Sequence, residues 1–217
     1  MYKLVVFDLD GTLLDTLDDL TSSTNAALTA HGFPTRTRAE VKSFIGDGIV
    51  KLLQRSVGIE NYPKMDELIA IFRAYYKEHC KDETRPYAGI MPLLYSLKEK
   101  GLLLGVLSNK VHAATVQLIA DYFPDIFDMV MGENEAAGIK RKPSPVALLK
   151  MMETLGVEKC ETAYVGDSEV DIQTASNAGV DCMSVTWGFK DESFLKANGA
   201  TNIVNDTTAL EGLLLSQ

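Results

Sequence analysis

The sequence predicts an α/β protein whose parallel sheet carries helices on both faces, with a bundle of helices inserted into it. Short apolar runs alternate with helix-length amphipathic stretches, which is the pattern of βα units in a parallel sheet. One long stretch, residues 16–84, has helical periodicity and no strand pattern. The chain has 217 residues, of which 46% are hydrophobic. That is enough for one large core with an insert.

The predicted strands are continuous apolar runs, as expected for strands that are buried on both faces. The first, Leu4–Phe7, begins close to the N-terminus. The others are expected at residues 102–107, 127–131, 162–165, 182–185 and 203–204.

Helices are expected between these strands, at residues 90–100, 112–122, 144–155 and 168–178. Three glycines, Gly101, Gly156 and Gly179, fall where helices should end, because glycine readily takes the left-handed conformation of a C-terminal cap. Pro145 suits the first turn of a helix, where a missing N–H costs little.

Residues 16–84 are predicted to form three or four helices. Apolar residues recur there at helical spacing, as in Leu68, Phe72 and Tyr76. Pro86 and Gly89 mark the return to the sheet. We therefore expect an α/β core of residues 1–15 and 85–217 and a helical domain of residues 16–84.

The chain is acidic, with 21 Lys and Arg against 30 Asp and Glu and a formal net charge of −9. Such a surface repels nucleic acid and anionic lipid, so neither is expected as a main partner. Residues 16–84 are nearly balanced in charge, so the excess of acids belongs to the α/β core.

Three cysteines at distant positions, Cys80, Cys160 and Cys182, form no Cys-X-X-Cys pair and no disulfide framework. There is no signal-peptide pattern and no apolar run of spanning length. A cytoplasmic location is expected, whereas a monomer and a homodimer both remain open.

Two acidic motifs follow predicted strands. Asp8 and Asp10 come directly after the first strand, and Asp167 and Asp171 come after the fourth. A lone Asp-X-Asp is more typical of a solvated loop. Two such clusters at strand ends of one parallel sheet, however, fit a site for a hard cation such as Mg²⁺.

A phosphate site also needs positive charge and hydrogen-bond donors. Lys140–Lys142 lies just before a predicted helix start, and Ser108 and Asn109 follow the second strand. Each feature alone is compatible with a solvated turn or a helix cap. Together with the acidic motifs, they predict one site at the carboxyl ends of four strands.

These segments together resemble the four ordered motifs of the haloacid dehalogenase superfamily, from Val5 to about Gly188. The segments are DLDGTLLDT at Asp8–Thr16, LSN at Leu107–Asn109, KP at Lys142–Pro143 and GDSEVD at Gly166–Asp171. The helical insert after the first motif resembles the C1-type cap of phosphatases in this superfamily. The resemblance implies a Rossmann-like sheet core and Mg²⁺-dependent hydrolysis.

The resemblance also implies a role for each matching residue. Asp8 would be the nucleophile that forms an aspartyl-phosphate, and Asp10 the general acid and base. Mg²⁺ would be held by Asp8, the backbone carbonyl of Asp10 and Asp167, with Asp171 in the outer shell. Lys142 would offset charge on the phosphate. Donors to the phosphate are expected from Ser108, Asn109, Gly11 and Thr12.

Within the superfamily, two further segments look most like the phosphoglycolate phosphatase branch. They are FIGDG at Phe44–Gly48 and TWGF at Thr186–Phe189. The loop of Gly46, Asp47 and Gly48 could offer N–H groups to a substrate carboxylate, or it could be a plain turn between helices. Asp47 would repel a carboxylate unless it points away.

Other activities of the superfamily are less well matched. Asp10 favours phosphate hydrolysis over dehalogenation. Leu20, Ile45 and Ile49 stand where sugar-phosphate mutases carry a cap-hinge histidine and basic residues. Lys42 and Lys51 are the candidates for the lysine of a phosphonatase, by position only.

The expected substrate is a small phosphomonoester, with 2-phosphoglycolate first. Pyrophosphate, a nucleoside monophosphate and a sugar phosphate are the alternatives for the same machinery. A non-catalytic α/β binding or regulatory module remains an alternative of a different class.

Overall fold

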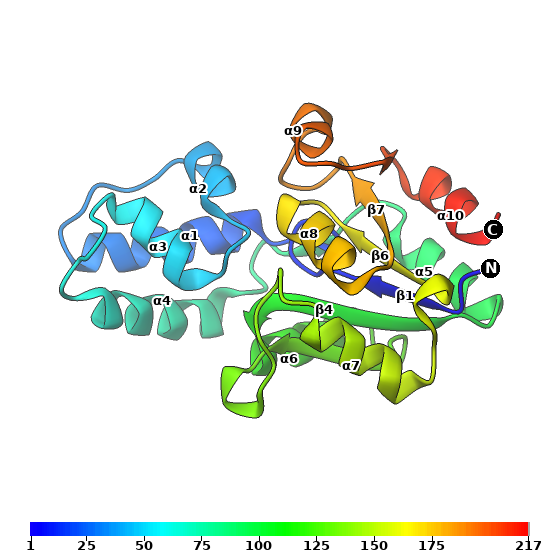
Figure 1. Ribbon diagram of the computed structural model, residues 1–217. Helices are drawn as coiled ribbons and strands as arrows, with labels where there is room; N and C mark the ends of the chain where they lie inside the picture. Colours follow the sequence, from blue (N-terminus) through cyan, green and yellow to red (C-terminus); the bar gives the residue numbers. More distant parts are fainter. Residues whose placement is uncertain (217) are drawn as a thin grey trace. The chain divides into compact units, whose positions relative to one another are not determined.

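A computed structural model describes residues 1–216 (Figure 1). The chain forms two compact units, one of Met1–Leu14 with the chain from Pro86 onward, and one of Asp15–Arg85. The first is an α/β unit and the second is helical. Across residues 1–216, every helix is too short or too polar to cross a membrane.

The α/β unit is built on a six-stranded sheet in the order β5-β4-β1-β6-β7-β8, in which all neighbouring strands are parallel. The strands are β1 (Leu4–Phe7), β4 (Leu103–Val111), β5 (Met129–Glu133), β6 (Thr162–Gly166), β7 (Asp181–Val185) and β8 (Asn202–Val204). The predicted α/β class with a parallel sheet is confirmed.

Helices flank this sheet on both sides (Figure 1). They are α5 (Ile90–Glu99), α6 (His112–Tyr122), α7 (Val146–Leu155), α8 (Glu169–Ala178), α9 (Glu192–Ala197) and α10 (Thr207–Leu215), with 3₁₀ turns η1 (Glu135–Ala137) and η2 (Lys159–Glu161). Leu4 and Val6 of β1 pack in one cluster with Leu148 of α7 and Ala175 of α8. The intervening side chains of β1 point to the opposite face, where right-handed crossovers place α5 and α6.

Most of the predicted strand boundaries differ from the structure by one or more residues, and two of these differences bear on the site and the core. β4 continues to Val111, so Ser108 and Asn109 lie inside this strand and not beyond it. β5 begins at Met129 and not at residue 127. Phe127 lies before the strand, and its ring packs edge-on against Phe7, with ring centroids 6.3 Å apart. Its hydrophobicity therefore serves the core and not a strand.

The register of the sheet brings several motifs together. β1 lies between β4 and β6, and Phe7 at its end is paired with Val106 on one side and Val165 on the other. The residues that follow these three positions therefore emerge at the same edge of the sheet. This is the edge at which open parallel sheets bind ligands.

The helical unit contains α1 (Leu17–Ala30), α2 (Arg38–Phe44), α3 (Ile49–Val57) and α4 (Met65–His79). The short strands β2 (Leu14–Asp15) and β3 (Arg85–Pro86) pair where the chain passes between the units. Asp19 of α1 is buried and accepts hydrogen bonds from Glu83 N at 3.0 Å and Thr84 N at 2.9 Å. These bonds fasten the end of the helical segment to its first helix.

Candidate active site

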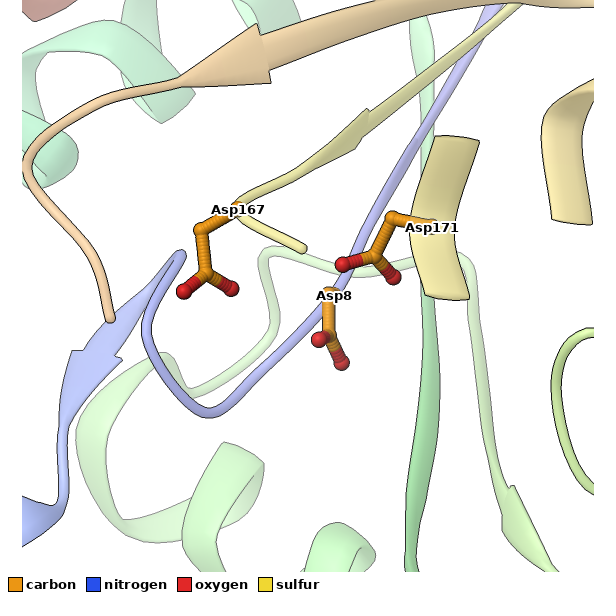
Figure 2. A group of neighbouring side chains, drawn as sticks. All are labelled: Asp8, Asp167 and Asp171. Atoms are coloured by element: carbon orange, nitrogen blue, oxygen red, sulfur yellow. The ribbon is translucent and has the colours of Figure 1, made fainter. Parts of the chain in front are cut away.

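Three buried aspartates converge at the carboxyl edge of the sheet (Figure 2). Asp8 directly follows β1, Asp167 directly follows β6, and Asp171 lies in the first turn of α8. One carboxylate oxygen from each lies within 4.8 Å of the others. Three buried negative charges this close are costly unless positive charge accompanies them.

Lys142 supplies part of that charge. Its Nζ lies 2.9 Å from Asp8 Oδ1 and 2.7 Å from Asp171 Oδ1, and its side chain is almost fully buried. With all four groups ionised, the cluster keeps a net charge of −2. A set of oxygen donors with this charge suits a divalent hard cation.

The pKa values in the cluster reflect this excess of negative charge. Burial raises the pKa of Asp8 to about 7, against the opposing effect of Lys142. Burial also raises the pKa of Asp167 well above its usual range, and the negative charges of Asp171 and Asp8 add to this. Burial by itself would lower the pKa of Lys142, but Asp171 and Asp8 hold it well above its usual value.

Asp167 is held by two donors from distant segments. Phe189 N donates to its Oδ2 at 2.7 Å, and Thr12 Oγ1 donates to its Oδ1 at 3.3 Å. Two glycines allow this packing, because a Cβ atom on Gly11 or on Gly188 would collide with the Asp167 side chain. Gly11 also has a φ of 87°, which few other residues adopt.

The backbone N–H groups of Gly11 and Thr12, which were expected to bind phosphate, are used inside the turn. Gly11 N donates to Leu14 O at 2.9 Å, and Thr12 N donates to Leu9 O at 3.3 Å. These two residues thus shape the turn and hold Asp167.

Asp171 has protein donors on both of its oxygens. Ser168 donates to Oδ2 from its Oγ at 2.6 Å and from its backbone N at 3.1 Å, which forms the capping box of α8. Tyr164 OH lies 3.2 Å from Oδ1, which Lys142 also contacts. The carboxylate is therefore fixed in direction and ties Lys142 to the start of α8.

Ser108 and Asn109 lie in the second half of β4, and Asn109 contacts the backbone of Lys142. Asn109 Oδ1 accepts from Lys142 N at 2.7 Å, and its Nδ2 donates to Lys142 O at 3.2 Å. Ser108 Oγ accepts from Lys110 N at 3.2 Å. Asn109 thus holds the backbone that carries Lys142.

Sequence reasoning missed Lys110. Its Nζ donates to both oxygens of the Asp10 carboxylate at 2.8 Å, and the two side chains are only 9% and 16% exposed. The signal was its position directly after Asn109, at the end of a predicted strand. It also missed Tyr164, whose hydroxyl is the only polar side-chain group in the otherwise apolar stretch Ala163–Val165.

Gly46, Asp47 and Gly48 lie in the helical unit, at the start of α3. Gly46 and Gly48 have φ values of 134° and 81°, and Gly48 is the N-cap of α3. Arg55 donates to Asp47 Oδ2 at 2.5 Å and to Phe44 O at 2.7 Å. The Asp47 carboxylate is therefore neutralised by an arginine, which reduces the repulsion expected from it.

The sequence is similar to one known family and to several of its proteins. Residues 5–185 match the family described as haloacid dehalogenase-like hydrolase. The chain is 33% identical over 208 residues to the phosphoglycolate phosphatase of Chromobacterium violaceum, covering 93% of each chain. It is also 33% identical to that of Neisseria meningitidis serogroup A, covering 92% of this chain and 86% of the relative.

Solved structures agree with these relatives. A protein of Lactobacillus delbrueckii subsp. bulgaricus, provisionally assigned as a phosphoglycolate phosphatase, superposes with a TM-score of 0.94 at 36% identity. The match covers 100% of this chain and 99% of the other. The sheet core with its helical insert is therefore shared by this chain and that protein.

Proposed function

Because this chain belongs to the haloacid dehalogenase-like hydrolase family and is a phosphatase, we propose that it hydrolyses a small phosphomonoester, 2-phosphoglycolate, through an aspartyl-phosphate. The observation that carries the proposal is the buried Asp8 carboxylate at the end of the central strand, 2.9 Å from the Lys142 ammonium. A carboxylate placed beside a buried cation can meet an anionic phosphate, which an isolated carboxylate would repel.

The cluster fits a divalent metal, and we assign Mg²⁺. Asp8, Asp167 and the backbone carbonyl of Asp10 would hold it, while Asp171 supports the site through Lys142 and Ser168. The fit rests on the oxygen-only donors and on the residual charge of −2. When bound, the metal supplies positive charge against the equatorial oxygens of the phosphoryl group.

Asp8 acts as the nucleophile. Its carboxylate oxygen attacks phosphorus, and the bond between phosphorus and the leaving-group oxygen breaks. Asp10 gives its proton to the departing alkoxide. In the second half, Asp10 takes a proton from water, and the resulting hydroxide attacks phosphorus. Phosphate then leaves and the Asp8 carboxylate is restored.

Other side chains stabilise the charge that is transferred. Lys142 offsets negative charge on the phosphoryl oxygens, and Ser108 and Asn109 donate hydrogen bonds to them. Two contacts support these roles: Lys142 lies 2.9 Å from Asp8, and Asn109 bonds the backbone of Lys142.

The helical unit, residues 16–84, is proposed as a cap that excludes water and selects the substrate. Its loop of Gly46, Asp47 and Gly48 is the candidate for binding part of the substrate. The ion pair between Asp47 and Arg55 supports this assignment, because the loop then carries no unbalanced negative charge.

The first experiment is hydrolysis of para-nitrophenyl phosphate with Mg²⁺ and with EDTA, beside Asp8→Asn as the control. We expect turnover that needs the metal and that Asp8→Asn abolishes. Turnover equal to that of Asp8→Asn would refute the catalytic proposal. The non-catalytic module would then be the better assignment.

The second experiment compares kcat/KM for 2-phosphoglycolate, pyrophosphate, a nucleoside monophosphate and a sugar phosphate. We expect 2-phosphoglycolate to be preferred. Another substrate preferred by more than about tenfold, or about 1.4 kcal/mol, would overturn the substrate and leave the mechanism intact.

A further inference from the structure

The carboxylate of Asp10 is paired with a lysine that the proposed chemistry does not use. Lys110 of β4 donates from one Nζ to both Asp10 oxygens at 2.8 Å. Its side chain is 9% exposed, so this ammonium is largely removed from water. Its placement is distinct from that of Lys142, which contacts Asp8 and Asp171.

We infer that Lys110 selects the substrate by binding a carboxylate on the leaving group of the phosphate ester. The inference rests on the proposed function and deepens it. It follows from where the ammonium lies, from the charge that it carries and from the size of the leaving group.

The position follows from Asp10. As the acid that protonates the leaving-group oxygen, Asp10 must touch that oxygen. A cation bonded to both Asp10 oxygens therefore lies on the leaving-group side of phosphorus. In 2-phosphoglycolate, a single methylene separates the ester oxygen from the carboxylate. This carboxylate is thus confined to the neighbourhood of Asp10, where the Lys110 ammonium lies.

The positive charge of Lys110 determines which substrates are favoured. An ammonium that is largely removed from water attracts a carboxylate within its reach more strongly than an exposed ammonium does. Lys110, lying against Asp10, can form an ion pair with the incoming carboxylate. An ester with a neutral leaving group gains nothing from the same ammonium. The favoured substrates are therefore phosphate esters of small hydroxycarboxylic acids.

A purely positioning role for Lys110 predicts a different result. If the lysine only holds Asp10 in place, its loss lowers kcat for every ester by the same factor. If it binds the substrate carboxylate, its loss raises KM for esters that carry one. The kinetics of two substrates that differ in the leaving-group carboxylate therefore distinguish a positioning role from a substrate-binding role.

The experiment measures kcat and KM with Mg²⁺ for 2-phosphoglycolate and for ethyl phosphate, which lacks the carboxylate. The proteins are the wild type, Lys110→Gln, Lys110→Arg and Lys150→Gln. Lys150 is an exposed lysine of α7, so its variant is a matched loss of one positive charge. Thermal melting of each variant checks its folding.

For Lys110→Gln, we expect kcat/KM for 2-phosphoglycolate to fall about 10- to 100-fold, mainly through KM, with a change under about threefold for ethyl phosphate. Lys110→Arg should recover part of the loss because it keeps the charge, whereas Lys150→Gln should stay within about twofold of the wild type. Binding of 2-phosphoglycolate to Asp8→Asn, measured by calorimetry, should weaken by the same factor when Lys110→Gln is added.

If kcat/KM of Lys110→Gln falls by the same factor for both esters, or falls for neither, the inference is overturned. So would a wild type that hydrolyses ethyl phosphate as efficiently as 2-phosphoglycolate, although the phosphatase mechanism would then stand. A wild type that hydrolyses neither ester with Mg²⁺ would refute the proposed function itself, and the role of Lys110 with it.

Discussion

The side chain of Asn109 forms two hydrogen bonds with the backbone of Lys142, one at its N–H and one at its carbonyl. Both residues are buried. The bonds join β4 to the loop before α7, across 33 positions of the sequence. The amide of Asn109 therefore sets where the buried ammonium of Lys142 lies relative to Asp8.

Replacing Asn109 with alanine should impair catalysis more than folding. The variant leaves two backbone groups of Lys142 without their partner, at about 1–3 kcal/mol of stability. A displaced Lys142 should lower kcat for para-nitrophenyl phosphate about 10- to 100-fold. Asn177→Ala is the matched control, because Asn177 is an exposed amide that bonds Pro143 O in the same loop. Equal kcat values for the two variants would contradict the role of Asn109.

The metal-free protein should lose stability as the pH rises. The folded-state pKa is raised for Asp8, to about 7, and for Asp167. A raised pKa adds stability that is present below the unfolded-state value and is lost as the pH passes through the folded-state value. With EDTA, the melting temperature should therefore fall as the pH rises from about 4, near the unfolded-state pKa of an aspartate, to about 7, the folded-state pKa of Asp8.

Mg²⁺ should offset this loss, so its effect on the melting temperature should be larger at the higher pH. Asp167→Asn removes one of the buried charges. It should flatten the pH dependence in EDTA and reduce the response to Mg²⁺. A melting temperature in EDTA that is constant or rises over the same range would show that ionisation of the buried carboxylates does not destabilise the folded protein.

Gly188 should not tolerate a side chain. A Cβ atom there would collide with Gly11 O and with Asp167. Gly188→Ala should destabilise the protein by about 1–3 kcal/mol in urea unfolding and reduce phosphatase activity. Gly212→Ala, in α10, is the control, since its added Cβ would meet nothing within 4 Å. It should stabilise by roughly 0.5–1 kcal/mol. Similar unfolding curves for the two variants would refute the packing argument.

The cysteines should differ in reactivity. Burial raises the pKa of the Cys182 thiol to about 12, whereas Cys160 is exposed. Since the thiolate is the reactive form, iodoacetamide near neutral pH should modify Cys160 first and Cys182 only after unfolding. Peptide mass spectrometry over time measures both, and Cys160→Ser should remove the early product. Modification of native Cys182 as fast as Cys160 would be the contrary result.

Much of the architecture follows from local patterns in the chain. The apolar run Leu4–Phe7 is long enough for a buried strand, and the acids directly after it must emerge at the strand end. The same reasoning places Asp167 after β6 and Ser168 at the N-cap of α8. The apolar pattern is misleading at Phe127, because this residue packs against Phe7 and does not belong to the predicted strand.

The sequence by itself thus determined the α/β class, the helical insert and the strand ends that carry the acidic motifs, because hydrophobic pattern and turn chemistry are local properties. Only the tertiary structure decided which side chains meet. Lys110 reaches Asp10 across 100 positions, and Asp47 is paired with Arg55 from the next helix. Such contacts depend on strand register and on the direction of each side chain, and no short stretch of sequence encodes either.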